Sequence, residues 1–233
     1  TLTSMTAAKE LDTGGPGDDI IPVEPGGLNE GDDIDGGEGF DTLELTSPGT
    51  IDLSAAASIR SVEAVAGSAG DDVIIVADFA LAGVTNVEGG EGFDSLIVKG
   101  VSVDLSRITL AGIERIAPQT ASPITINVRD FEAAALVDGS GGIVHVTVSG
   151  AALTAEQRAN LFANGVDQII DGSGRKFVPS DADITVGAEA RVNTATAGDQ
   201  RDVTITALAD GGWVTAWTSA NQDGAGWGVY LQR

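Results

Sequence analysis

Hydrophobic residues along this chain fall in short runs that alternate with polar residues, and turns rich in Gly, Asp and Asn separate the runs. Residues 124–128 (ITINV) and 143–148 (IVHVTV) show the alternation most clearly, and it is typical of strands that bury one face. Residues 203–208, 213–217 and 227–231 have a similar pattern. The pattern therefore predicts an all-β chain.

One segment has a different pattern. In residues 153–165, Thr154 and Gln157 form a capping box, and Asn164-Gly165 supplies an end, so we expect a short helix there. A helix that follows the last strand of a stack would cover the open strand edges at that end.

Residues 14–66 and 67–119 are two copies of one unit. Each copy holds two turns of the form G-G-x-G-x-D-x-U-x, where U is a large aliphatic residue; the turns begin at Gly14, Gly36, Gly67 and Gly89. Glycines let the backbone approach a cation, the Asp supplies a carboxylate oxygen, and the aliphatic residue points into a narrow core. A repeat of about 20 residues predicts a parallel solenoid, in which each coil packs on its neighbours.

The pattern weakens after the second copy. We expect residues 120–180 to form degenerate coils that stack without metal, because their glycine-rich turn lacks the Asp. Composition changes near Pro179, and all three Trp and the single Tyr lie in the last 21 residues. We therefore expect two domains: a solenoid over 1–180, and a small antiparallel β-module over 181–233 with turns at 210–212 and 221–224.

Charge narrows the choice of partners. The formal net charge is −23, and residues 1–98 hold 20 acidic residues against only Lys9 and Arg60. Such a field repels nucleic acid and anionic membrane surfaces and attracts divalent cations. The alternative interpretation is an acidic surface that is simply solvated. No apolar run approaches the length of a membrane span, so we expect no membrane insertion.

Catalytic chemistry has little support in the sequence. His145 is the only His and there is no Cys, so the usual zinc sites and His-based triads are not indicated. Carboxylate pairs are better explained by cation binding or solvation. We expect no enzyme activity in this segment. The sequence lacks an initiator Met and ends within an apparent repeat, so we expect a fragment of a longer chain.

The turns of residues 14–119 resemble the repeats-in-toxin (hemolysin-type) calcium-binding repeats of bacterial secreted proteins. The segment 192–233 is similar to a Trp-containing repeat of about 50 residues common in large secreted proteins of the same kind. The resemblance implies a right-handed parallel β-roll, folding driven by Ca²⁺, type I secretion and an extracellular location, with attachment to the cell surface as one alternative.

Carried over residue by residue, the resemblance implies metal ligands at Gly15, Gly17, Asp19, Asp33, Gly37, Gly39, Asp41, Gly70, Asp72, Gly90, Gly92 and Asp94. The good copies are 22 residues apart instead of in tandem, so we expect roughly one to four ions and not a full row. Phe40 and Phe93 stand where the family has a small polar residue, which leaves ion binding and a structural turn as alternatives for those two loops.

Two functions follow. The first is a non-catalytic, calcium-stabilised structural or adhesive protein, such as a surface-layer, filament or adhesin component, whose candidate partners are other copies of itself and cell-surface polysaccharide. The second is an accessory calcium- or carbohydrate-binding region of a larger secreted polysaccharide-modifying enzyme. The aromatic residues Trp213, Trp217, Trp227 and Tyr230 are either the core of the β-module or a contact site for sugar or partner.

Overall fold

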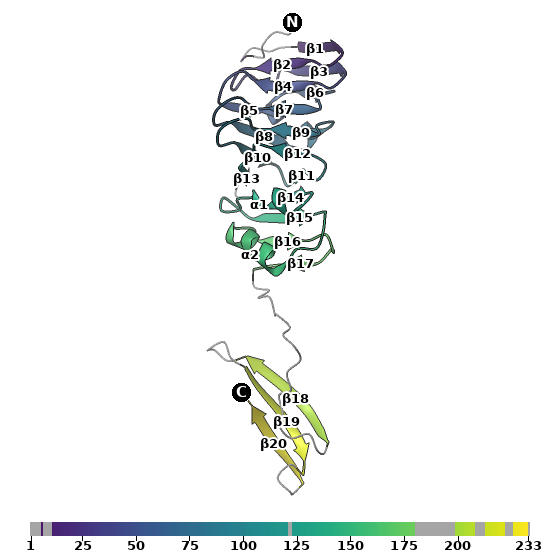
Figure 1. Cartoon of the computed structure of the whole chain (residues 1–233), viewed down its shortest axis with the longest axis vertical. Helices are drawn as coiled ribbons and strands as arrows, with labels where there is room; N and C mark the ends of the chain where they lie inside the picture. The colour runs from purple at the N-terminus through teal and green to yellow at the C-terminus, as the bar shows by residue number, and fades with distance from the viewer. Residues whose placement is uncertain are drawn as a thin grey trace. The chain divides into compact units, whose positions relative to one another are not determined.

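The structure, a computed structural model, describes residues 6, 11–120, 123–179, 199–207, 213–221 and 226–232. They fall into two compact units, one within 1–183 and one within 184–233. Both units consist mainly of strands, which form parallel sheets in the first and an antiparallel sheet in the second (Figure 1). The all-β prediction is confirmed at this level.

The first unit is built from four sheets in which neighbouring strands are parallel, apart from the final pair. The first sheet has the strand order β1 (Leu11–Pro16), β3 (Asp33–Glu38) and β6 (Ser58–Arg60), and the second has the order β12 (Thr109–Ala111), β9 (Asn86–Glu88), β7 (Ala64–Ala66), β4 (Thr42–Leu45) and β2 (Ile20–Val23). The third sheet has the order β13 (Arg115–Pro118), β10 (Ser95–Lys99), β8 (Val73–Ala77) and β5 (Thr50–Asp52). The fourth sheet has the order β11 (Ser102–Asp104), β14 (Ile124–Val128), β15 (Val144–Val148), β16 (Gln168–Ile170) and β17 (Lys176–Phe177).

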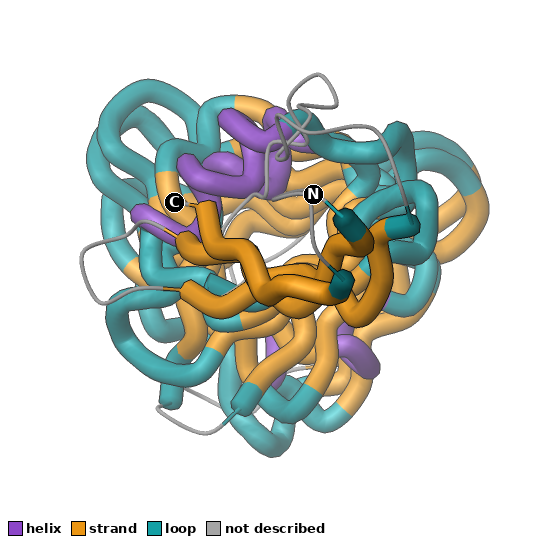
Figure 2. Tube along the Cα trace, turned by 90° about the horizontal axis from the view of Figure 1, so that it is seen from below, coloured by secondary structure: helices purple, strands orange, loops and turns teal. Residues whose placement is uncertain are grey.

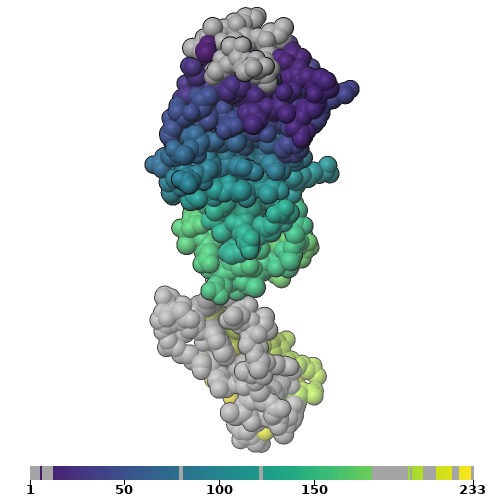
Figure 3. All heavy atoms as spheres, turned by 45° about the horizontal axis from the view of Figure 1, so that its top comes forward, coloured from purple at the N-terminus to yellow at the C-terminus, as the bar shows by residue number. Residues whose placement is uncertain are grey.

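Strands that pair in parallel in this unit lie about one coil apart, where a coil is the stretch of roughly 20–25 residues between a strand and its neighbour in the same sheet. Ile21 pairs with Leu43, Leu43 with Val65, and Val65 with Val87, and all four side chains are fully buried. Each alternating strand thus adds one apolar side chain to a row that continues through the stack. Figure 3 shows successive segments of this unit following one another as bands of colour, and Figure 2 shows strands lying behind one another.

The two sequence copies occupy different sheets. Strand β2 of the first copy aligns in sequence with β8 of the second, yet β2 pairs with β4 and β8 pairs with β5 and β10. The reason is the length of the sequence repeat. Two coils of 22 residues account for 44 of its 53 residues, and the remaining nine residues are the length of one strand with its turn. Each strand of the second copy therefore lies one side further around the coil than the equivalent strand of the first copy, in a different sheet.

In the described part of the chain, two α-helices and two 3-10 helices interrupt the strands. The predicted helix is confirmed as α2 (Ala155–Ala163), with Thr154 as N-cap and the capping box to Gln157 in place. Its predicted place after the last strand is wrong, because β16 follows it and pairs in parallel with β15. The prediction of a single helix is also wrong, since α1 (Phe131–Ala135) forms behind the N-cap Asp130; the 3-10 turns are η1 (Leu53–Ala55) and η2 (Asp78–Leu81).

The second unit is a three-stranded antiparallel sheet of β18 (Gln200–Ala207), β19 (Trp213–Ala220) and β20 (Trp227–Gln232). The three predicted strands are confirmed. The predicted turn at 210–212 and most of the turn at 221–224 lie outside the described residues. Among the helices that the structure describes, none has the length and apolarity needed to cross a membrane.

Candidate functional site

The four Gly/Asp turns lie on two different edges of the first unit. Asp19 and Asp41 stand where the chain passes from β1 to β2 and from β3 to β4, whereas Asp72 and Asp94 stand directly before β8 and β10. This separation follows from the advance of the second copy by one side. Four of the five carboxylates predicted to bind metal therefore form two separate pairs, and the fifth, Asp33, lies on β3.

Within the first pair, the carboxylates accept backbone N–H groups across neighbouring coils. The N–H of Asp19 donates to Oδ1 of Asp41 at 2.8 Å, and the N–H of Asp41 donates to Oε2 of Glu63, also at 2.8 Å. Oδ2 of Asp19 accepts the N–H of Gly15 at 2.7 Å within its own turn. These residues form what we call the first carboxylate ladder.

The second pair repeats the arrangement. The N–H of Asp72 donates to Oδ1 of Asp94, and the N–H of Asp94 donates to Oε2 of Glu114, both at 2.8 Å. Asp72 itself accepts the N–H of Gly49 on Oδ1 at 2.7 Å and the N–H of Ser68 on Oδ2 at 2.5 Å. In this second carboxylate ladder both oxygens of Asp72 are engaged.

The glycines fit this geometry. A Cβ placed at Gly36 or Gly89 would overlap a carbonyl oxygen of the next coil, that of Ser61 or of Gly112. Only glycine allows so close an approach. Of the seven glycines predicted as ligand-flanking, Gly15 lacks a positive φ, and the other six have one: Gly17, Gly37, Gly39, Gly70, Gly90 and Gly92.

Two carboxylate oxygens of the ladders have no hydrogen-bond partner. Oδ2 of Asp41 and Oδ2 of Asp94 are buried without a hydrogen-bond partner, and both residues are fully buried. The Cβ position of Gly36 lies 2.5 Å from the Asp41 oxygen and overlaps the carbonyl oxygen of Ser61, so two acceptors lie on the same side of Gly36. The position at Gly89 has the same relation to Asp94 and Gly112.

A buried carboxylate oxygen without a partner is costly unless a proton or a cation compensates the charge of the group. Burial raises the pKa of Asp94 above its ordinary value, although the hydrogen bond from the Asp72 N–H opposes the shift; repulsion from Asp72, Glu114 and Asp71 adds to it. Burial, with the neighbouring carboxylates adding to it, therefore disfavours the charged form of Asp94.

The donor set fits calcium only in part. Among the described residues, no three His, Cys, Asp or Glu side chains are grouped as a metal would require. Asp72 has no oxygen to spare, and Asp33 is paired with Arg60 at 2.7 Å on a different strand. Asp41 and Asp94 each keep one oxygen next to a backbone carbonyl, which is the kind of donor pair that calcium accepts. Calcium binding stays a prediction. A buried oxygen without a partner favours Asp41 and Asp94, because Asp19 is only half-buried and both oxygens of Asp72 accept hydrogen bonds.

Four residues of the ladders were not singled out from the sequence. Glu63 and Glu114 end the two ladders, while Asp18 and Asp71 accept the N–H groups of Phe40 and Phe93 at 2.8 and 2.9 Å; all four are half-buried or exposed. The spacing could have indicated these contacts, because it equals one coil. The residues of each pair are 22 positions apart: Asp18 and Phe40, Asp71 and Phe93, and Asp41 and Glu63.

The aromatic residues of the second unit divide between two environments. Trp217 is 6 % exposed and stacks on Tyr230, with ring centroids 6.3 Å apart, whereas Trp227 is 55 % exposed with the Arg201 guanidinium 5.2 Å from its ring. The side chain of Trp213 lies outside the described residues. Core packing thus describes Trp217, and only Trp227 presents its ring to solvent among the described Trp side chains.

His145 lies on β15, where its register neighbours are Thr125 and Gln168 on the adjacent strands.

Comparison of the chain with models of protein families, with curated proteins and with solved structures finds no match.

Proposed function

We propose that this chain is a non-catalytic, extracellular structural or adhesive protein whose first unit is a right-handed parallel β-solenoid stabilised by calcium. The parallel pairing with a repeat of about 22 residues and the continuous buried rows support the solenoid. Solenoids offer long, regular side faces, which suit scaffolding and adhesion.

The observation that carries the calcium part is the pair of buried, unpartnered oxygens on Asp41 and Asp94. They stand 53 residues apart at equivalent positions of the two copies, so each copy buries one carboxylate oxygen without a partner. Asp41 with the Ser61 carbonyl, and Asp94 with the Gly112 carbonyl, would hold the ions. Calcium there supplies positive charge that compensates both buried carboxylates.

The many acidic residues among the first 98 connect calcium binding with folding. At the low calcium concentration of a cell interior the carboxylates repel one another, which favours an extended chain suited to export. At millimolar calcium outside, each site filled tenfold above its dissociation constant adds about 1.4 kcal/mol to the free energy of unfolding. Two sites then contribute about 3 kcal/mol.

The test compares melting temperatures in chelator and in about 5–10 mM calcium, a range above typical extracellular-site affinities. We expect calcium to raise the melting temperature of the wild-type chain by about 5–10 °C. The double variant Asp41→Asn/Asp94→Asn should lose this rise. Asp33→Asn is the matched control, since Asp33 lies in the same repeat but is paired with Arg60, and it should keep the full response.

Two results would contradict the proposal. One is a wild-type melting temperature that is the same with and without calcium. The other is a double variant that responds to calcium as strongly as the wild type.

A further inference from the structure

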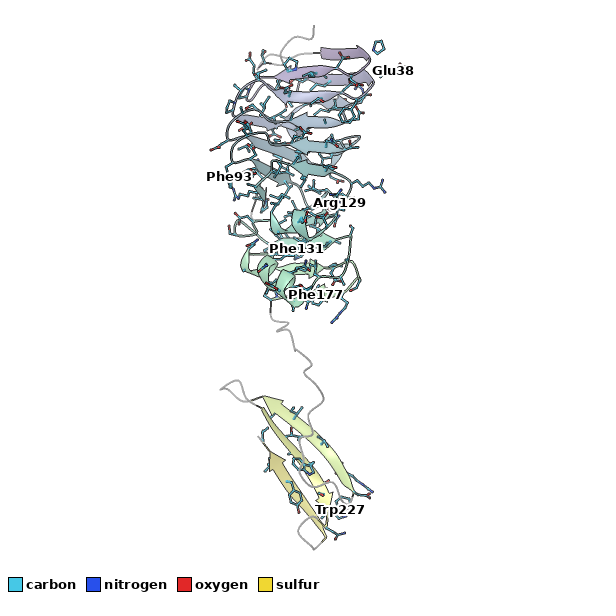
Figure 4. All side chains as sticks on the ribbon, in the orientation of Figure 1. Glu38, Phe93, Arg129, Phe131, Phe177 and Trp227 are labelled. Atoms are coloured by element: carbon cyan, nitrogen blue, oxygen red, sulfur yellow. The ribbon has the colours of Figure 1, made fainter. Side chains whose placement is uncertain are left out.

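A shallow hollow of about 230 Å³ lies on the side of the first unit, next to Glu114 at the end of the second ladder. Its wall contains Phe93, Glu114, Arg115, Asp138 and Asn164, together with residues 135–137. These residues come from four successive coils, which the parallel stacking brings together. Figure 4 labels Phe93 at the side of the stack, with its coil close to the level of β10 and β13.

Phe93 presents its ring to solvent from a fixed backbone. The side chain is 54 % exposed, and its N–H is held by Oδ1 of Asp71 at 2.9 Å. Exposing a phenylalanine costs free energy in water unless a ligand covers it. Phe40 is its counterpart in the first copy, 43 % exposed and held in the same way by Asp18.

The surroundings of the two rings differ. Glu63 and Glu114 are equivalent ladder ends, but Ala64 follows the first and Arg115 follows the second. Nε of Arg115 donates to Oδ2 of Asp138 at 2.9 Å. Hydrogen bonds from Ser140, helped by Arg115, lower the pKa of Asp138, so the pair is ionised at neutral pH. The Phe93 ring therefore shares its hollow with an ion pair, formed by Arg115 of the second copy and Asp138 of the coil after it, whereas the residue equivalent to Arg115 beside Phe40 is Ala64.

This combination has the chemistry of a sugar site. An aromatic face packs against the C–H face of a pyranose ring, while carboxylates accept and guanidinium and amide groups donate hydrogen bonds to its hydroxyls. The Nε–H of Arg115 is used in the ion pair, and its terminal nitrogens carry four further N–H donors. The hollow is smaller than the 300–1,000 Å³ or so of a drug-sized pocket, which suits one ring.

We propose that the Phe93 hollow binds a single ring of a neutral polysaccharide. Neutral sugar is favoured over uronate or phosphate groups because Glu114 and Asp138 outnumber Arg115 within the hollow, and the chain as a whole carries −23. The inference goes beyond the proposed function by naming a ligand class and a place, and none of the hollow's residues is a calcium candidate.

The experiment titrates the whole chain, in calcium and below its melting temperature, with four hexasaccharides observed by saturation-transfer NMR. The neutral probes are hexamers of β-1,4-glucose, α-1,4-glucose and β-1,4-mannose, and the anionic probe is a hexamer of β-1,4-mannuronate. We expect at least one neutral probe to bind and the anionic probe to bind more weakly. Phe93→Ala should weaken binding about tenfold or more, and Arg115→Met should weaken it too.

Phe40→Ala is the matched control, since it removes an exposed ring at the same repeat position, and it should leave binding unchanged. Circular dichroism of each variant checks that the fold is kept. The proposal is overturned if no neutral probe binds, if the mannuronate probe binds best, or if Phe40→Ala and Phe93→Ala weaken binding equally. None of these outcomes depends on the melting response to calcium, so the two proposals fail separately.

Discussion

The N–H of Asp72 donates to Oδ1 of Asp94 at 2.8 Å although the two residues are 22 positions apart. The same relation joins Asp19 to Asp41. A buried N–H that points between coils needs an acceptor, and a carboxylate makes a stronger hydrogen bond than a neutral group. The repeated aspartates therefore stabilise the stack even before any cation is considered.

Replacing Asp72 by Ala should destabilise the chain in the presence of chelator. The change leaves the N–H groups of the half-buried Gly49 and Ser68 without their acceptor, and each orphaned donor costs about 1–3 kcal/mol. We expect a loss of about 3 kcal/mol in the free energy of unfolding, measured by urea denaturation.

Asp71→Ala is the control for that change. Asp71 is exposed, so water can replace its bond to the Phe93 N–H, and the expected loss is below about 1 kcal/mol. Equal losses for Asp71→Ala and Asp72→Ala would show that the ladder does not carry the stability assigned to it.

Gly89→Ala should be among the most damaging single changes in the chain. The added methyl would overlap the backbone carbonyl of Gly112, which is held by the neighbouring coil and cannot move without separating the coils. We expect a loss above about 3 kcal/mol, at or beyond the usual range for overpacking.

Gly141→Ala tests whether the effect comes from the contact and not from the residue type. A Cβ at Gly141 would meet only Cγ of Pro118, at 4.0 Å, and no positive φ constrains the backbone there. Its unfolding free energy should change by less than about 1 kcal/mol. A Gly89→Ala variant as stable as Gly141→Ala would contradict the tight inter-coil approach.

Much of the strand pattern could be predicted from the sequence, because alternation reports burial directly. The β14 and β15 strands and the three antiparallel strands of the second unit appear where the pattern indicated them. The capping box at Thr154 also formed as its residue types require. Such local signals depend on neighbouring residues alone.

The arrangement of the turns could not be predicted in the same way. Where two equivalent turns meet in space depends on the number of residues per coil, which no single motif contains. The sequence shows that the Gly/Asp turns repeat, but it does not show that the 22-residue coil divides Asp19 and Asp41 from Asp72 and Asp94. The short helix α1 was missed because one N-cap and five residues give too little periodic pattern.

Lys99→Met should produce a modest, salt-dependent loss of stability. Lys99 pairs with Ala77 of β8, yet its Nζ lies 2.6 Å from both Oδ2 of Asp52 and Oγ of Ser54, so its side chain crosses β8 to join a third coil. Lysine and aspartate are each about a quarter exposed, so solvent screens the pair and we expect about 1 kcal/mol.

A double-mutant cycle with Asp52→Asn checks the Lys99 prediction. The coupling energy should be positive at low salt and shrink at about 1 M salt, where the screening length falls to about 3 Å. Lys176→Met, an exposed lysine on β17, should change little and serves as control. A coupling energy of zero at low salt would contradict the role of the pair.

Asp171→Asn should cost stability at neutral pH and progressively less as the solution becomes acidic. Asp171 is 3 % exposed; Oδ1 accepts the N–H and hydroxyl of Ser173 at 3.0 and 2.5 Å, and Oδ2 accepts the N–H of Leu153 at 3.1 Å. Burial alone would raise its pKa, but these hydrogen bonds together with the N–H of Arg175 outweigh burial and lower it.

The direction of the pH dependence follows from that lowered pKa. The unfolded chain takes up the proton near pH 3.9 and the folded chain only at lower pH, so Asp171 contributes its full stabilisation above about pH 5 and loses it as the pH falls through the folded value. Urea denaturation of wild type and variant between pH 7 and about pH 2.5 should show the two free energies of unfolding converging. Ser173→Ala removes one of the stabilising donors and should converge with the wild type over the same range with a smaller difference at pH 7. A difference between wild type and Asp171→Asn that stays constant with pH would mean that the hydrogen bonds to Asp171 stabilise its charged and neutral forms equally.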